Sequence, residues 1–290
     1  MLKYGLALLA LGMPAIVMAQ IGAEPTARRE PRVDAPPIKA DKLILVGDST
    51  MAPGSGWASV FCAYHVKSTL ACLNLGRGGR STRSYRAEGS WTIALNEAKA
   101  AGYGKVYVLI QFGHNDQSSK GERWTDLATE FSANLSQMVT DVRETGAVPV
   151  LVTPLSRREF RDGKLQNTLV PWSDEVRKVA SAMQVPLIDL NRDSAAVVQK
   201  LGAADATELA QAPPLPEELE AARKGTTLRP RPAVEAREPA GEPPATGPRG
   251  RLQPKFDYTH LGEAGARVIS KIIANDLAVT VPGLRSQLLP

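Results

Sequence analysis

The sequence predicts an α/β fold built on a doubly wound parallel sheet. Short runs rich in Val, Ile and Leu recur along the chain between Gly, Pro or Asp residues, a pattern typical of fully buried parallel strands. Segments with apolar residues at steps of three and four, typical of amphipathic helices, accompany these runs. The alternation predicts right-handed crossovers. Because ligands of such sheets bind beyond the carboxyl ends of the strands, the residues that follow each run are the candidates for chemistry.

Five runs are the expected strands: residues 42–46, 70–75, 105–112, 148–154 and 185–190. Three helical patterns are expected, at residues 127–142, 176–183 and 263–277. The first is the clearest, since its apolar residues fall on one helical face; they are Leu127, Phe131, Leu135, Met138 and Val142. Gly146 ends this helix, and Pro149 lies at the start of the next strand.

The first 19 residues predict a secretory signal peptide. Lys3 precedes an apolar run over residues 6–18, and small residues lie before a cut after Ala19. A membrane anchor is the alternative, but the run is shorter than the roughly 20 apolar residues of a spanning helix, and Pro14 interrupts it. We therefore expect a mature chain in the periplasm or outside the cell, without stable membrane insertion. Residues 20–39 are polar and proline-rich, which predicts a linker before a single domain at 40–290.

Charge and proline content limit the alternatives for the rest of the chain. The 35 Lys and Arg residues exceed the 30 Asp and Glu residues only slightly, so the charge of +5 gives no reason to expect a nucleic-acid partner. Residues 203–253 hold one Ala/Glu-rich piece that could form a short helix, followed by a proline-dense stretch without apolar periodicity. These residues predict a largely disordered surface insertion, with a lid over the site as the alternative.

Two cysteines, Cys62 and Cys72, lie ten residues apart. In an oxidising compartment they could form a disulfide, and otherwise they would be two small buried thiols. Spacing along the chain does not decide between the two, because a disulfide requires that the Cα atoms lie close together in space.

Reactive side chains follow three of the expected strands. Ser49 follows the first, Gly79 lies in the glycine-rich stretch after the second, and Asn115 follows the third. Asp257 and His260 come immediately before the last helix. At one edge of the sheet, these residues would supply a nucleophile, a base, a group that orients the base, and donors for an oxyanion.

Several neighbouring residues are expected to have structural roles. We interpret Asp48 as a hydrogen-bond acceptor that fixes the loop of the nucleophile, and His114 as a residue that hydrogen-bonds loops beneath the site. Ser49 itself could instead be only a helix N-cap. Three tryptophans could stack on sugars, although core packing is the expected use; they are Trp57, Trp91 and Trp172.

The motifs resemble those of the SGNH, or GDSL-type, hydrolases. The strings GDSTM, GRSTRSY, QFGHND, VTPLSRREF and DYTHLGEAGA are similar to the rhamnogalacturonan acetylesterase family of carbohydrate esterases, over residues 42–202 and 254–275. The resemblance implies a flavodoxin-like three-layer fold with a five-stranded parallel sheet. The chain departs from the family's pattern in the insertion and at Tyr258, where the family more often has a small residue.

The resemblance also implies a role for each motif residue. Ser49 is expected to be the nucleophile, His260 the base and Asp257 the acid that orients it. The oxyanion donors are expected to be the backbone N–H groups of Ser49 and Gly79 and the side chain of Asn115. Such a mechanism needs no metal and no organic cofactor.

Arginines after the second and fourth strands bear on the substrate. A guanidinium group binds a carboxylate through two parallel hydrogen bonds, so Arg80, Arg83 and Arg158 are candidate substrate-binding residues for an anionic polysaccharide such as pectin. Arginines that hold loops together or keep the surface soluble are the alternative.

The predicted function is that of a secreted serine esterase that removes acetyl groups from pectic polysaccharide. One alternative keeps the enzyme but changes the substrate to another acetylated glycan, such as xylan, or to a lipid. An aromatic content of 5% makes a lipid the less attractive choice. The other alternative is a non-catalytic carbohydrate-binding protein that uses the same crevice, although binding alone does not need a catalytic triad.

Overall fold

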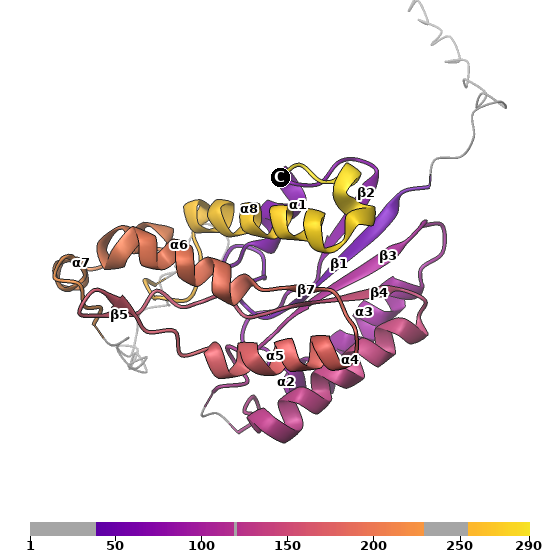
Figure 1. The fold of residues 1–290 in the computed structure, drawn as a ribbon, viewed down its shortest axis with the longest axis horizontal. Coiled ribbons are helices and arrows are strands. Elements are labelled where there is room, and N and C mark those ends of the chain that lie inside the picture. The colour runs from indigo at the N-terminus through magenta and orange to yellow at the C-terminus, as the bar shows by residue number, and fades with distance from the viewer. Residues whose placement is uncertain (1–38, 119–120, 229–254) are drawn as a thin grey trace, which may run out of the picture. The chain divides into compact units, whose positions relative to one another are not determined.

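A five-stranded parallel sheet forms the centre of the computed structural model, which describes residues 39–118, 121–228 and 255–290 (Figure 1). The strands lie in the order β2-β1-β3-β4-β7. Their bounds are Asp41–Gly47 for β1, Leu70–Asn74 for β2, Val106–Gln111 for β3, Val148–Val152 for β4 and Leu187–Ile188 for β7. The five predicted parallel strands are confirmed, and their order is the flavodoxin-like one.

Helices cover both faces of the sheet. They are α1 (Ala58–Tyr64), α2 (Thr82–Ala87), α3 (Ser90–Lys99), α4 (Ser132–Glu144), α5 (Val170–Ala182), α6 (Leu190–Asp205), α7 (Pro216–Arg223) and α8 (Glu263–Thr280). A π-helical turn, η1 (Leu127–Phe131), precedes α4, while η2 (Ala206–Leu209) and η3 (Pro282–Gln287) are 3-10 helices. A short antiparallel hairpin joins β5 (Phe160–Arg161) to β6 (Lys164–Leu165). None of the helices in the described part is long and apolar enough to cross a membrane.

Alternation along β1 divides the interior into two cores. Leu43 and Leu45 face a core with α1 and α8, whereas Ile44 and Val46 face a core with α3 and α4. Figure 1 shows this division, with α1, α6 and α8 on one side of the sheet and α2 to α5 on the other. Because both faces of β1 are buried, its sequence reads as a continuous apolar run, which is why the strand could be predicted.

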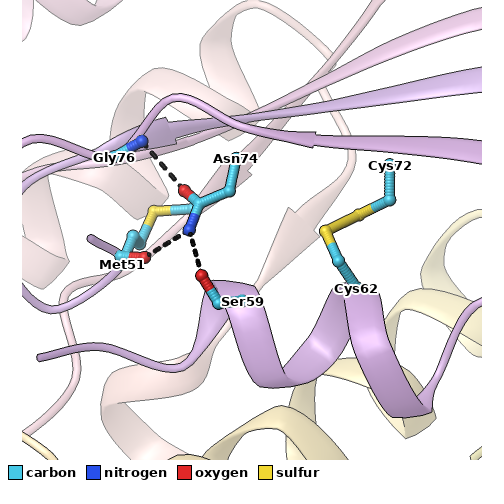
Figure 2. The surroundings of a disulfide bond; sticks show 6 residues. All are labelled: Met51, Ser59, Cys62, Cys72, Asn74 and Gly76. Atoms are coloured by element: carbon cyan, nitrogen blue, oxygen red, sulfur yellow. Dashed lines mark hydrogen bonds between the residues drawn. A yellow bond between two sulfur atoms is a disulfide. The ribbon is translucent and has the colours of Figure 1, made fainter. Parts of the chain in front are cut away.

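The two cysteines form a disulfide that joins α1 to β2 (Figure 2). Asn74 at the end of β2 donates to the Met51 carbonyl at 2.9 Å and to Ser59 Oγ at 3.0 Å. Its side-chain oxygen accepts from the Gly76 N–H at 2.9 Å. The end of β2 is therefore tied to the turn that follows β1, where the predicted nucleophile lies.

Residues 203–228 differ from the disorder expected of them. They complete α6, form η2 and include α7, which is the short Ala/Glu-rich helix. Small apolar side chains of this segment pack with Phe160 and Val198; they are Ala203, Ala206, Leu209 and Ala222. Alanine-rich contacts of this kind leave no strong apolar periodicity in the sequence. Residues 229–253 of the expected insertion lie outside the described residues, as do the expected signal peptide and residues 20–38 of the linker.

Candidate active site

Three side chains form a hydrogen-bonded series at the carboxyl edge of the sheet. Ser49 lies in the turn after β1, and its Oγ is 2.8 Å from Nε2 of His260, just before α8. Nδ1 of the same ring is 2.6 Å from Oδ2 of Asp257. Since a carboxylate accepts the Nδ1 hydrogen, Nε2 is left as the acceptor for the Ser49 hydroxyl. The structure thus brings Ser49 together with Asp257 and His260, although Ser49 and His260 lie 211 positions apart in the sequence.

The second oxygen of Asp257 fixes the loop that carries the histidine. Oδ1 accepts the backbone N–H groups of Thr259 and His260, both at 2.7 Å. Burial opposes ionisation of Asp257, but the hydrogen bonds and charge of His260, with these backbone donors, lower the pKa of Asp257 to about 2. The hydrogen bond to Asp257 in turn raises the pKa of His260 above its ordinary value, although burial works against it. The carboxylate is therefore ionised and holds the imidazole in one orientation.

The turn that presents Ser49 is held from within the protein. Asp48 is buried, and its Oδ1 accepts both the N–H and the hydroxyl of Thr50 at 2.8 Å. Ser55 Oγ donates to the Ser49 carbonyl at 2.7 Å. Gln111, the last residue of β3, donates to the Thr50 hydroxyl at 2.6 Å. Asp48 is thus the loop-fixing acceptor that the sequence indicated.

Two backbone N–H groups without a partner among the described residues indicate a candidate oxyanion site. Across residues 39–118, 121–228 and 255–290, no group accepts a hydrogen bond from the N–H of Ser49 or Gly79. Gly79 has a φ of +76°, a left-handed conformation that favours glycine. The Asn115 amide donates to the Arg80 carbonyl at 3.0 Å, and its second hydrogen has no protein partner within the described ranges. These are the three donors that the sequence proposed.

His114 lies buried beneath this site and faces Asp48. Its Nδ1 is 3.4 Å from Asp48 Oδ2, and neither ring nitrogen forms a hydrogen bond to any residue that the structure describes. The ring therefore does not hydrogen-bond the surrounding loops as expected. Burial lowers the pKa of His114, which favours a neutral ring.

The structure corrects the role expected of Arg158. Only 2% of this residue is exposed, and the guanidinium donates to the carbonyls of Asp257 at 2.9 Å, His260 at 2.8 Å and Thr259 at 3.3 Å. Its backbone N–H also donates to the Tyr258 carbonyl at 2.8 Å. Burial lowers the pKa of Arg158 to about 10, so the group remains a cation at neutral pH. Arg158 therefore braces the segment with Asp257 and His260 and is not available to a substrate.

The other two candidate arginines are also engaged within the protein. Arg80 pairs with Glu88 at 2.8 Å and donates to the Gly78 carbonyl at 2.7 Å. Arg83 binds both carboxylate oxygens of Glu130 and donates to the Gly121 carbonyl at 3.0 Å. These contacts favour the alternative in which arginines hold the loops together.

An arginine that the sequence analysis missed lies beside the oxyanion site. A Cβ at Gly79 would be 3.1 Å from a terminal nitrogen of Arg123, so the guanidinium lies directly against this glycine. Arg123 belongs to no motif, and only its position between the third strand and the following helix could have drawn attention to it. The neighbouring Trp124 is 46% exposed, whereas Trp57 and Trp91 pack in the core as expected.

The remaining tryptophan and Tyr258 also pack inside the protein. Trp172 is partly buried against the core that contains α4. Tyr258 is 2% exposed, and its ring meets Phe256 edge to face. Burial raises the pKa of Tyr258 to about 12, so its hydroxyl stays neutral. Within the described part of the chain, no group of three or more His, Cys, Asp or Glu residues could hold a metal ion.

The chain is similar in sequence to known proteins. The model of the GDSL-like lipase/acylhydrolase family matches residues 45–268. The chain is 37% identical over 160 residues to the rhamnogalacturonan acetylesterase RhgT of Bacillus subtilis (strain 168), which covers 52% of this chain and 66% of RhgT. It is 30% identical over 170 residues to YesY of the same organism, named a probable rhamnogalacturonan acetylesterase, over 56% of this chain and 76% of YesY.

Two solved structures share the fold at low sequence identity. The crystal structure of protein YxiM from Bacillus subtilis has a TM-score of 0.58 and 22% identity, covering 84% of this chain and 57% of YxiM. A mutant of Axe2, an acetyl-xylooligosaccharide esterase from Geobacillus, has a TM-score of 0.52 and 16% identity, covering 83% of this chain and 95% of Axe2. The matched region thus spans less than two thirds of RhgT and of YxiM.

Proposed function

Because the chain belongs to the GDSL-like lipase/acylhydrolase family, we propose that it is a serine esterase that removes O-acetyl groups from polysaccharide, with pectic rhamnogalacturonan as the favoured substrate. The observation that carries the proposal is the hydrogen-bonded series of Ser49, His260 and Asp257, beside donors that have no partner among the residues the structure describes. The 37% identity to RhgT supports the choice of substrate.

The first half of the proposed reaction forms an acetyl-enzyme. His260 Nε2 takes the proton of Ser49 as Oγ attacks the carbonyl carbon of the acetyl ester. The N–H groups of Ser49 and Gly79 and the amide of Asn115 stabilise the negative charge that develops on the carbonyl oxygen. When the tetrahedral intermediate collapses, the C–O bond to the sugar breaks and His260 gives its proton to the leaving sugar oxygen.

The second half returns the enzyme to its starting state. His260 takes a proton from a water molecule, which attacks the acetyl carbonyl carbon, and the same donors stabilise the second oxyanion. Collapse breaks the bond to Ser49 Oγ, which regains the proton, and acetate leaves. Asp257 stabilises the imidazolium form in both halves and does not itself take up the proton. None of these steps requires a metal or an organic cofactor.

Secretion is part of the proposal. The first 19 residues have the charged start, apolar run and small residues of a signal peptide. The disulfide between Cys62 and Cys72 supports a periplasmic or extracellular location, because disulfides persist in oxidising compartments.

The proposal is tested by acetate release from acetylated rhamnogalacturonan and acetylated xylan. Ser49→Ala should lower kcat on the preferred glycan by about 10⁴-fold or more, because it removes the Oγ that forms the acetyl-enzyme. Ser181→Ala, an exposed serine near the end of α5, is the matched control and should retain full activity. Retained activity in Ser49→Ala, with an unchanged Tm, would contradict the mechanism. A preference for xylan would contradict the favoured substrate but not the esterase.

A further inference from the structure

The loop formed by residues 121–126 carries an arginine that differs from the other arginines of the site. Arg80 and Arg83 pair with glutamates, and Arg158 donates to backbone carbonyls. Arg123 has neither an ion pair nor a hydrogen bond with any residue in the described part of the chain. A guanidinium that lies at the site without an internal partner is available to a ligand.

Two consecutive glycines place this guanidinium beside the proposed nucleophile. A Cβ at Gly78 would lie 3.9 Å from Cβ of Ser49, and a Cβ at Gly79 would lie 3.1 Å from a terminal nitrogen of Arg123. Because consecutive Cα atoms are about 3.8 Å apart, one short stretch of backbone lies close to both side chains. The same stretch offers the Gly79 N–H, which donates to no group in the described ranges. A glycan that delivers its acetyl group to Ser49 therefore passes close to Arg123.

Contacts on both sides of Arg123 hold the loop against the site. Thr125 is fully buried, and its N–H and hydroxyl donate to Asp116 at 3.2 and 3.1 Å. At the other end, Arg83 donates to the Gly121 carbonyl at 3.0 Å. Trp124, directly before the buried threonine, is 46% exposed. The loop thus carries a guanidinium and an exposed indole on consecutive residues of an anchored backbone.

We propose that Arg123 and Trp124 form a subsite for an acidic sugar of the substrate chain. Arg123 binds the carboxylate of a uronic acid near the acetylated sugar, since a guanidinium matches a carboxylate with two charge-assisted hydrogen bonds. Trp124 packs against the apolar face of a sugar ring. The subsite rests on the proposed function, and it would make an acidic pectic chain a better substrate than a neutral glycan.

The subsite is tested by equilibrium binding, which does not depend on acetate release. In the Ser49→Ala background, isothermal titration calorimetry compares trigalacturonate with trigalactose, its uncharged counterpart. We expect trigalacturonate to bind at least about tenfold more tightly, and less tightly as salt screens the charges. Arg123→Gln should remove most of this difference, and Trp124→Ala should weaken the binding of both sugars.

Controls separate the subsite from general effects of charge. Arg143→Gln, near the far end of α4, removes the same charge and should leave the preference for trigalacturonate intact. Arg123→Lys keeps the charge but loses the paired hydrogen bonds, so it should retain only part of the preference. Equal binding of the two sugars, or equal weakening of both by Arg123→Gln, would overturn the subsite. A failure to release acetate from any glycan would instead contradict the proposed function.

Discussion

The largest influence on the pKa of His260 is the neighbouring carboxylate of Asp257. The hydrogen bond from Nδ1 to Asp257 raises the pKa of His260, and the same contact leaves Nε2 facing Ser49. The proposed mechanism needs the neutral ring as a base, so activity should fall as the pH drops through this raised pKa. In the proposed mechanism, Asp257 should therefore affect both the rate and its pH dependence.

Replacing Asp257 should lower kcat and move the acid limb of the pH profile to lower pH. Asp257→Asn should lower kcat by about 10⁴-fold, because the wrong tautomer and an unsupported imidazolium result. It should also lower the pKa of His260, so the acid limb of kcat/KM moves to lower pH. A pH profile on p-nitrophenyl acetate from pH 4 to 9 measures both effects. Asp174→Asn, an exposed carboxylate of α5, serves as the control, and an unmoved acid limb in Asp257→Asn would contradict the assigned role.

Among the secondary-structure elements, the strands could be predicted from the sequence, whereas the structure of residues 203–228 could not. β1 is buried on both faces, so its apolar run is visible in the sequence without any knowledge of neighbours. The helix pattern at 127–142 is likewise visible, because Leu135, Met138 and Val142 are all buried on one side of α4. Residues 203–228 were harder, because alanines with little apolar surface bury against Phe160, and that contact exists only in the folded protein.

The disulfide between α1 and β2 should increase the free energy of unfolding measurably. The disulfide joins residues ten positions apart, and closing a loop of this size in the unfolded chain is worth about 2.5 kcal/mol. A chain with both Cys62→Ser and Cys72→Ser should lose this amount of unfolding free energy in urea, while kcat stays within about twofold because neither cysteine is part of the proposed active site. Wild-type protein in a reductant should behave like the double variant. An unchanged urea midpoint would show that the link does not restrict the unfolded chain.

The whole molecule has to unite pieces of the site that lie far apart in the sequence. Ser49 follows β1, whereas Asp257 and His260 lie just before α8, beyond α6 and α7. Arg158, after β4, reaches this late segment with three side-chain hydrogen bonds to its carbonyls. The buried guanidinium thus joins the sheet to the loop that carries the base.

Breaking this connection should misplace the base as well as destabilise the protein. Arg158→Met leaves buried carbonyls without donors, so we expect the free energy of unfolding to fall by about 3 kcal/mol. A displacement of His260 by about 1 Å would lower kcat by about 100-fold. If Arg158 positions His260, added guanidinium ion should restore part of the kcat of Arg158→Met. A loss of kcat that comes only from general destabilisation would not be restored. Arg161 is an exposed arginine of β5, and Arg161→Met should leave kcat and the free energy of unfolding unchanged. Full kcat in Arg158→Met would contradict the positioning role of Arg158.

The sequence alone was enough to predict the parallel sheet and the meeting of Ser49, His260 and Asp257 at its edge. Buried strands and the short motifs that follow them can be recognised within a few consecutive residues. Parallel strands then bring their carboxyl ends to one edge of the sheet. Only the tertiary structure determined which group each arginine binds. Arg83 and Arg158 meet their partners through contacts between distant segments, while Arg123 meets none among the described residues. Whether a charged side chain faces a substrate or the protein depends on which groups the fold places around it.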